Sequence, residues 1–209
     1  MLELATIHKS FGDHTVLSVG PRRLPPGVYW LRGANGSGKS TLLNILAGLL
    51  PFKGDIILNE TISIHRHPVA YRQLVNHAPA EPVFPAFLTG TSLVQFARSI
   101  KKGNTGQLRQ VQETLGIGDY LANPTGSYSS GMLKKLSLLL AFTGRPAWVL
   151  LDEPFTTLDQ ASQQALTRVI RAQHSRDISF IITSHHDIPP ADLAFSGVFT
   201  VRDKQLQDG

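Results

Sequence analysis

The chain has 209 residues, of which 42% are hydrophobic, and it contains no cysteine. A chain of this length buries one sizeable core, so we expect a single domain with at most a subdomain. The lack of cysteine excludes disulfides, thiolate zinc sites and cysteine nucleophiles, and it fits the cytosol. The formal net charge of +5 fits either a solvated basic surface or attraction to a nucleotide, a membrane surface or a nucleic acid.

The basic residues are scattered, and the densest clusters are the pairs Arg22–Arg23, Lys101–Lys102 and Lys134–Lys135. These pairs do not decide between the two interpretations of the net charge. No apolar run reaches the roughly 18 to 20 residues that span a bilayer. The N-terminus lacks the basic start and apolar block of a secretion signal. We therefore expect a soluble protein that stays inside the cell.

Hydrophobic periodicity predicts strands and helices in alternating order. In chain order, we expect a strand over 2–8, a turn over 9–14, a strand over 28–31, a helix over 40–50, a strand over 54–58, an irregular connection over 79–88, exposed helices over 92–100 and 107–115, a strand over 148–151, a helix over 160–172, and strands over 178–183 and 198–201. This order is typical of an α/β fold with a mainly parallel sheet. The helical stretch in the middle interrupts it as an insertion.

A glycine-rich stretch, GANGSGKST at 33–41, lies between a predicted strand and a predicted helix. It satisfies the pattern G-x-x-x-x-G-K-[ST]. Glycines let backbone N–H groups converge on phosphate oxygens, and the helix N-terminus adds its positive end. We expect Lys39 to reach the β- and γ-phosphates of a nucleotide and Ser40 to ligate Mg²⁺. The alternative is a glycine-rich turn with a structural lysine.

A second motif, VLLDEP at 149–154, is a buried-strand pattern that ends in two adjacent acids. Because side chains alternate along a strand, Asp152 and Glu153 point differently and can do different work. We expect Asp152 to hold Mg²⁺, usually through water, and Glu153 to orient or deprotonate the attacking water. The alternative is a strand end that leads into a turn. A phosphate loop alone leaves kinases, GTPases and motor ATPases open.

A third stretch, YSSGM at 128–132, precedes an apolar run, and its serines Ser129 and Ser130 are suitable N-caps for a helix. With this stretch, the chain resembles the ATP-binding subunit of an ABC transporter over essentially its whole length. GANGSGKST resembles the Walker A motif of that family, WVLLDEP its Walker B motif with the catalytic glutamate, and YSSGM its signature, usually written LSGGQ. The order and spacing of the motifs agree as well.

The resemblance implies an architecture. We expect the α/β fold of P-loop NTPases, with a mainly parallel core sheet, an antiparallel N-terminal β part and an inserted helical subdomain. Residues 1–209 then form one ABC ATPase domain. Its nucleotide-binding core is 1–87 and 143–209, and its helical subdomain, which carries the signature helix, is 88–142.

The resemblance also implies individual roles. Phe11 would stack on adenine, and His185 would hold the γ-phosphate end of the site as a switch histidine. Ser129 and Gly131 would contact the γ-phosphate of ATP held by a second subunit, and Asp159 would communicate between the two sites. The expected nucleotide-binding residues are Phe11, Asn35, Gly36, Ser37, Gly38, Lys39, Ser40, Thr41, Ser129, Gly131 and Asp159; the expected catalytic residues are Glu153, His185 and Lys39; the expected metal ligands are Ser40 and Asp152.

Each of the weaker matches has a local alternative. Phe11 alone reads as a core residue, Asp159 as the N-cap of the helix that starts at Gln160, and His185 as a polar strand end. Two departures from the family pattern add to these alternatives. The signature has Ser130 and Met132 where glycine and glutamine are common, a form that resembles subfamilies with separately encoded permeases, including ABC-2-type exporters.

The second departure is Ala80, which stands where the family has the Q-loop glutamine, with Glu81 beside it. In the family that glutamine ligates magnesium and couples ATP to the membrane partner. Because magnesium readily keeps several waters, we expect hydrolysis to survive the change, at the same or a lower rate.

The sequence therefore predicts an ATPase with ATP and Mg²⁺ as cofactors. We expect a homodimer on ATP binding, or a pair with a related ATPase subunit, that powers transport through separate integral membrane permease subunits from the inner face of the cell membrane. No nucleic acid is expected. One alternative is a soluble ABC ATPase that acts on DNA or ribosomes, and another is a weakly active regulatory partner. The transported substrate and its direction stay open.

Overall fold

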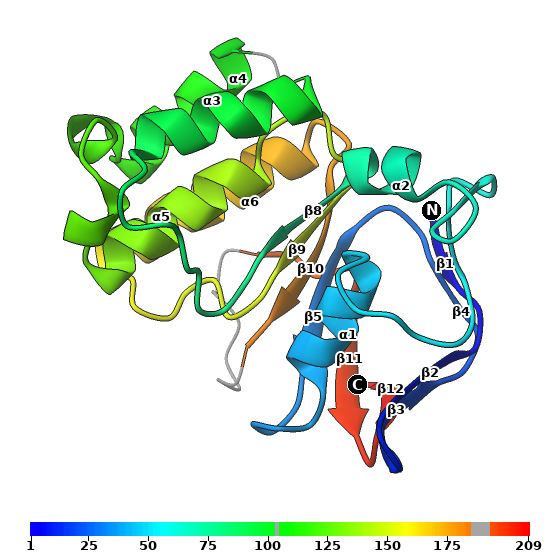
Figure 1. Cartoon of the computed structure of the whole chain (residues 1–209). Coiled ribbons are helices and arrows are strands. Elements are labelled where there is room, and N and C mark those ends of the chain that lie inside the picture. Colours follow the sequence, from blue (N-terminus) through cyan, green and yellow to red (C-terminus); the bar gives the residue numbers. More distant parts are fainter. Residues whose placement is uncertain (103–104, 185–192) are drawn as a thin grey trace.

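A six-stranded sheet forms the centre of the protein (Figure 1). The computed structural model describes residues 1–102, 105–184 and 193–209. The strand order is β12-β11-β5-β10-β9-β8, in which the last five run parallel and β12 pairs antiparallel with β11. The bounds are β5 Val28–Arg32, β8 Val75–Ala78, β9 Trp148–Leu151, β10 Ser179–Thr183, β11 Gly197–Arg202 and β12 Gln205–Asp208.

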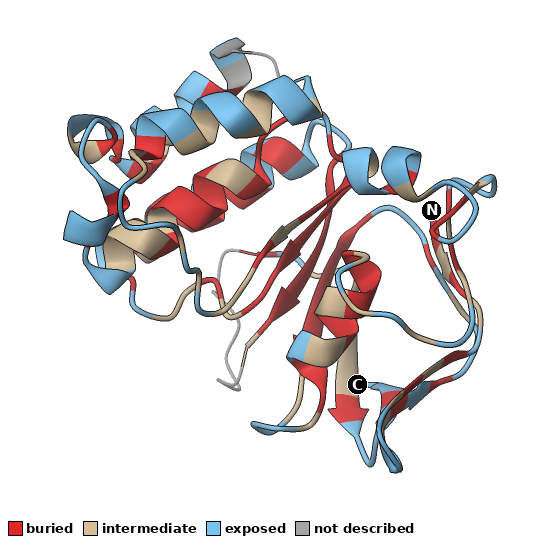
Figure 2. Ribbon diagram, viewed as in Figure 1, coloured by how far each residue is buried: buried red, intermediate tan, exposed pale blue. Residues whose placement is uncertain are grey.

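The parallel strands are covered on both faces, which explains why β9 and β10 are buried along their whole length (Figure 2). Alternate residues enter two different cores. Leu150 of β9 packs into the core shared with α1 (Lys39–Leu46), whereas Val149 and Leu151 pack into the core under the other helices. The expected mainly parallel sheet is confirmed.

The N-terminal part is antiparallel, as expected. One sheet has the order β4-β1-β6-β7, and a separate hairpin pairs β2 with β3. The bounds are β1 Leu2–Leu4, β2 Ile7–Phe11, β3 His14–Val19, β4 Arg22–Leu24, β6 Ile56–Leu58 and β7 Ile62–Ser63. The single strand predicted over 2–8 is therefore two strands in different sheets. The turn predicted over 9–14 is too long, because β2 runs to Phe11 and Gly12 alone takes the left-handed φ of 56°.

Helices cover the sheet in two unequal layers (Figure 1). α1 lies on one face. The opposite face carries α3 Gly90–Lys101, α4 Thr105–Leu115, α5 Ser130–Ala141 and α6 Gln160–His174. Three short elements complete the description: α2 Pro68–Leu74 and the 3-10 turns Gly118–Tyr120 and Thr125–Ser127.

The helix predicted over 40–50 ends at Leu46, because Gly48 turns the chain with a φ of 72°. The helices predicted over 92–100, 107–115 and 160–172 are present with slightly wider bounds. The helices of the expected insertion 88–142 contact the rest of the chain, since α5 packs on β8 and β9 and α4 packs on α6. Within the described residues, every helix is too short or too polar to span a membrane.

Candidate active site

The glycine-rich loop joins the end of β5 to the start of α1. Gly38 is the N-cap of α1 in the left-handed region (φ 108°), and a Cβ there would lie 3.2 Å from the side chain of Leu17. No side chain caps this helix, and no acid lies in its first turn. The N–H groups at the helix start therefore keep their positive potential for an anion.

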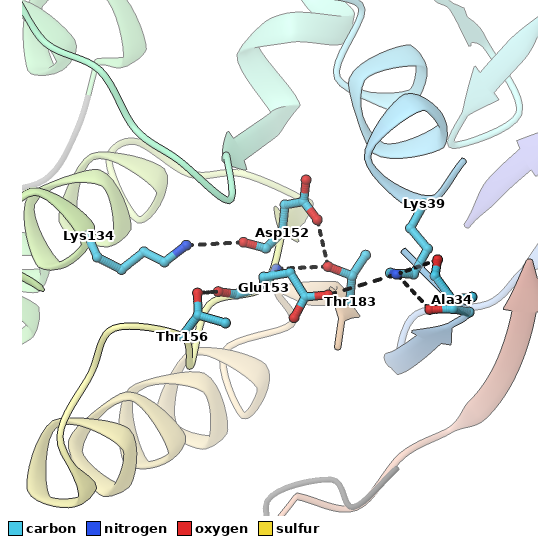
Figure 3. Close-up of polar contacts among 8 residues, drawn as sticks. Ala34, Lys39, Lys134, Asp152, Glu153, Thr156 and Thr183 are labelled. Carbon is cyan, nitrogen blue, oxygen red and sulfur yellow. Dashed lines mark hydrogen bonds and ion pairs between the residues drawn. The ribbon is translucent and has the colours of Figure 1, made fainter. Parts of the chain in front are cut away.

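Lys39 is held inside the loop. Its side chain is 6% exposed, and its Nζ donates hydrogen bonds to the carbonyl oxygens of Gly33 (2.7 Å) and Ala34 (3.2 Å) (Figure 3). The same Nζ lies 3.9 Å from Oε1 of Glu153. The loop carbonyls and the carboxylate thus fix the ammonium between the glycine-rich loop and the acid that follows β9.

The other loop residues differ in exposure. Asn35, Gly36 and Ser40 are exposed, and Thr41, the next residue of α1, is half-buried. The Oγ of Ser37 is buried and has no hydrogen-bond partner among the described residues. The loop thus presents polar groups that its own chain leaves available for a ligand.

Asp152 is buried at the carboxyl end of β9, with 3% exposure. Thr183, at the end of the neighbouring β10, donates from Oγ1 to Oδ1 of Asp152 over 2.7 Å. The same Oγ1 accepts a hydrogen bond from the backbone N–H of Glu153 at 2.8 Å (Figure 3). One hydroxyl therefore fixes both the carboxylate of Asp152 and the backbone of Glu153.

Glu153 adopts an uncommon backbone conformation for a residue with a side chain, with a φ of 45°. Its carbonyl accepts a hydrogen bond from Oγ1 of Thr156 at 2.8 Å. Left-handed residues of this kind cost about 1–3 kcal/mol and persist only where the surroundings hold them. Here the turn directs the carboxylate toward Lys39, away from the carboxylate of Asp152 (Figure 3). The two acids therefore point differently, as the sequence predicts.

The residues fit a magnesium ion that is held together with phosphates. Within the described part of the chain, no group of three or more His, Cys, Asp or Glu side chains is placed to hold a metal. Mg²⁺ needs no such cage, because it takes one or two protein oxygens and completes its shell with phosphate oxygens and water. The hydroxyl of Ser40 and the carboxylate of Asp152 are oxygen ligands of that kind.

The start of α5 is a second, exposed polar feature. Ser129 is its N-cap, as predicted, and its Oγ accepts from the backbone N–H of Met132 at 3.3 Å. The N–H of Ser129 in turn contacts Sδ of Met132 at 3.5 Å, so the methionine completes a capping box. A Cβ on Gly131 would lie 3.0 Å from the carbonyl oxygen of Thr157, which explains the glycine.

The three weaker sequence matches have different outcomes. Phe11 is 53% exposed on the β2–β3 hairpin, with Nζ of Lys9 4.5 Å from its ring centroid, so the core alternative is wrong. Asp159 is the N-cap of α6, and its Oδ1 accepts from the N–H of Ser162 at 2.7 Å. This hydrogen bond lowers the pKa of the carboxyl. His185 lies outside the described residues.

Sequence reasoning missed Thr183 and the role of Lys134. Nζ of Lys134 contacts the backbone carbonyl of Asp152. For Thr183 a signal existed. The predicted strand over 178–183 ends at this threonine, and the carboxyl ends of adjacent parallel strands meet at one edge of the sheet. The polar residue that ends the strand is therefore placed beside the acids after β9.

A phosphate loop between a strand and a helix, with two acids at the end of a neighbouring strand, defines a P-loop nucleoside triphosphatase. The family model described as "ABC transporter" matches residues 24–156. The chain therefore belongs to the ABC transporter family. It is an ATPase that binds ATP and couples its hydrolysis to transport.

Relatives and solved structures agree with this assignment. The lantibiotic transport ATP-binding protein SrtF of Streptococcus pyogenes is 27% identical over 186 residues, which are 88% of this chain and 80% of SrtF. The cytochrome c biogenesis ATP-binding export protein CcmA of Legionella pneumophila is 28% identical over 191 residues, 90% of this chain and 94% of CcmA.

Two solved structures share the fold. One, described as the ATP-binding subunit of an ABC transporter, has a TM-score of 0.88 at 21% identity and covers 100% of this chain and 90% of its own. The other is a dimeric ATP-binding cassette in a post-hydrolysis state with ADP and Pi. It has a TM-score of 0.80 at 17% identity and covers 100% of this chain and 98% of its own.

Proposed function

We propose that this chain is the ATP-hydrolysing subunit of a transporter whose membrane-spanning subunits are separate polypeptides, and that it works at the inner face of the cell membrane. Two copies, or one copy and a related subunit, close over two ATP molecules. SrtF and CcmA, which this chain matches over most of their length, are both described as ATP-binding transport or export proteins. The structural neighbour with ADP and Pi is a dimer.

The proposed membrane partner is supported by a groove of about 610 Å³ that lies between the core and the helices α3 and α5. Its walls come from the side of α1, from α2, β8, α3 and α5. The lining includes Asn44, Leu49, Val69, Arg72, His77 and Ile100. Leu49, Val69 and Ile100 are 60%, 70% and 50% exposed. A protein partner that covers apolar side chains of this size gains free energy from their burial, which a solvated surface does not provide.

Two basic side chains, Arg72 and Lys101, line the groove, and no Asp or Glu is among its described lining residues. Nζ of Lys101, at the end of α3, donates to the carbonyl oxygens of Arg72 in α2 and Val75 in β8, so it joins α3 to both elements. These hydrogen bonds stabilise the walls of the groove, and a short segment of a membrane subunit would fit into it.

In the proposed reaction, each part of the site has one task. Phe11 stacks on the adenine, and the N–H groups from Gly36 to Thr41 hold the phosphates. Lys39 exchanges its loop carbonyls for β- and γ-phosphate oxygens. Ser40 and Asp152 would hold Mg²⁺, which would neutralise charge on the phosphates. Glu153 orients the attacking water and accepts its proton.

The start of α5 supplies the other half of the site. We propose that Ser129 and the N–H of Gly131 contact the γ-phosphate of ATP bound to the second subunit, since a hydroxyl and free N–H groups at a helix start attract an anion. His185 would hold the γ-phosphate end, and Asp159 would lie at the interface between the two sites. A single chain then holds ATP without completing either site.

The test is phosphate release by the purified chain as a function of protein and Mg²⁺ concentration. We expect Mg²⁺-dependent hydrolysis whose specific rate rises with protein concentration. Glu153→Gln should abolish turnover and let ATP drive a stable dimer. A wild-type chain with no Mg²⁺-dependent phosphate release at any concentration would overturn the proposed reaction. Pull-down of the tagged chain from its native membranes should recover a multispanning membrane protein; recovery without one would overturn the proposed partner.

A further inference from the structure

Lys134, near the start of α5, is a buried lysine. Its side chain is 1% exposed and is one of the largest that the described residues bury fully. A solvated basic surface was one interpretation of the pair Lys134–Lys135, and for Lys134 its burial excludes that interpretation. The residue shares a helix face with Leu138, four positions later and also buried, so the side chain points toward the sheet.

The ammonium of Lys134 meets three carbonyl oxygens. Nζ lies 2.6 Å from the oxygen of Ala80, 3.3 Å from that of Pro79 and 3.3 Å from that of Asp152. Figure 3 shows the last of these contacts, with the lysine directed at the backbone of Asp152. A lysine has three N–H donors, so the three carbonyls can use its whole hydrogen-bonding capacity.

Packing alone does not require a charge at this position. Burial lowers the pKa of Lys134 to about 8, against the opposing effect of the negative charges of Asp152, Glu153 and Glu81. Replacing buried charged groups by apolar side chains of similar size is often neutral or stabilising. A methionine or leucine would therefore fill the contact between α5 and the sheet at a lower desolvation cost. The reason for a lysine must lie in the groups that it holds.

Those groups belong to segments that meet at the active site. Asp152 is the candidate magnesium ligand at the end of β9. Pro79 and Ala80 follow β8 at the same edge of the sheet, and the N–H of Asp152 donates to the carbonyl of Ala78 at 2.9 Å. The methyl group of Ala80 has no hydrogen-bonding capacity, so the ammonium of Lys134 supplies a side-chain contact there. Ser129, the N-cap of the helix that carries the lysine, lies five residues earlier.

We propose that Lys134 is a positioning residue that ties the start of α5 and the 79–80 segment to the backbone of Asp152. Through it, the end of α5 that meets ATP on the second subunit and the magnesium ligand of the subunit's own site move as one unit. The inference rests on the proposed function, because it concerns how the two sites of a dimer are linked.

The experiment compares Lys134→Met, Lys134→Arg and the control Lys135→Met, which removes the same charge from the neighbouring, half-exposed position. We expect Lys134→Met to bind ATP with wild-type affinity and to keep its KM, while kcat falls roughly 10- to 100-fold, as for misplacement by about an ångström. Lys135→Met should retain wild-type kcat. Thermal unfolding checks that each variant is folded.

The arginine variant separates positioning from packing. Methionine matches the volume of lysine but donates no hydrogen bond, whereas arginine is bulkier and keeps both charge and donors. We expect Lys134→Arg to recover more of kcat than Lys134→Met, although it should be the less stable protein. The inference is wrong if kcat of Lys134→Met lies within twofold of the wild-type value, or if it is higher than kcat of Lys134→Arg.

A second measurement applies if neither variant folds. In crystals of the Glu153→Gln chain with ATP and Mg²⁺, Nζ of Lys134 should stay within hydrogen-bond distance of the oxygens of Ala80 and Asp152. A closed dimer in which these contacts are broken overturns the inference. This outcome can be told apart from failure of the proposed function, because in that case the wild-type chain itself would have no ATPase activity.

Discussion

The hydroxyl of Thr183 donates a hydrogen bond to the carboxylate of Asp152 at 2.7 Å. The same hydroxyl accepts a hydrogen bond from the backbone N–H of Glu153 at 2.8 Å. The threonine itself is fully buried. One side chain from β10 thus fixes two groups that follow β9, and the positions of the candidate magnesium ligand and the candidate base depend on a single hydroxyl.

Thr183→Val should therefore lower kcat roughly 10- to 100-fold with little change in KM, because the acids lose their alignment while the phosphate loop is intact. Stability should fall by about 1–3 kcal/mol, the cost of leaving a buried group without its partner. The measurements are steady-state phosphate release and denaturant unfolding. Thr167→Val is the matched control, since Thr167 is also buried and donates to the carbonyl of Gln163 in α6. It should affect stability alone.

Ser129 has two roles to separate, the N-cap of α5 and the proposed phosphate contact. Ser129→Ala should cost about 1 kcal/mol of stability through the lost cap. Ser129→Asp keeps a good cap, but it places a negative charge where the γ-phosphate of the second subunit would lie. We expect Ser129→Asp to fold as wild type and to lose ATP-driven dimerisation in the Glu153→Gln chain, measured by gel filtration. Dimerisation as in Glu153→Gln alone would contradict the phosphate contact.

The candidate site can be read from the sequence more directly than the residues that hold it in place. The phosphate loop and the acids after β9 are contiguous motifs, so their chemistry can be read locally. The predicted strand over 148–151 matches β9 in both bounds. Thr183 and Lys134 belong to the site only through tertiary contacts. Lys134 still carried a signal, since it lies at a core-facing position of an apolar helix.

β8 was missed because its four residues, VNHA, do not form an apolar run. Asn76 is nevertheless buried, and its Nδ2 donates to the carbonyls of Ala141 and Thr143 at 2.8 Å each. The polar strand is therefore stabilised by the end of α5, 65 residues later in the chain. Local sequence patterns do not contain such a contact.

The exposed ring of Phe11 leads to a prediction about nucleotide affinity. Because the side chain is 53% exposed, Phe11→Ala should change stability little. Loss of a stacking contact worth about 1 kcal/mol should raise KM for ATP roughly fivefold with kcat unchanged. Phe11→Trp should retain the wild-type KM. Phe96→Ala, at a 66% exposed position on α3, is the control for loss of an exposed ring. An unchanged KM in Phe11→Ala would exclude adenine stacking.

Lys101 leads to a prediction about pH. Burial lowers its pKa from the ordinary 10.5 to about 8. Between these values the unfolded chain binds more protons than the folded one, so this lysine makes stability rise with pH from about 8. Above pH 10 the buried Tyr71 and the partly buried Tyr120, whose pKa is raised by burial, act in the opposite direction.

The measurement is denaturant unfolding from pH 7.5 to 10. Lys134 also makes the free energy of unfolding rise with pH, because its pKa is likewise lowered to about 8. Lys101→Met should therefore show a smaller rise than wild type, but a rise nonetheless. Lys102→Met, at the exposed neighbouring lysine, should keep the wild-type slope. Equal slopes for Lys101→Met and wild type would show that Lys101 titrates alike in the folded and unfolded chain.

The proposed docking groove is tested at Val69, which is 70% exposed on its rim. Val69→Asp places a charge among apolar side chains that the membrane subunit would cover, and burying an unpaired carboxylate is costly. An acid near the N-terminus of α2 does not disturb the helix itself. The variant should keep the ATPase rate of the isolated chain and lose co-purification with the membrane subunit. Ala172→Asp, at an exposed position on α6 outside the groove, should retain it. Equal recovery of the membrane subunit with both variants would show that the membrane subunit contacts a different surface of this chain.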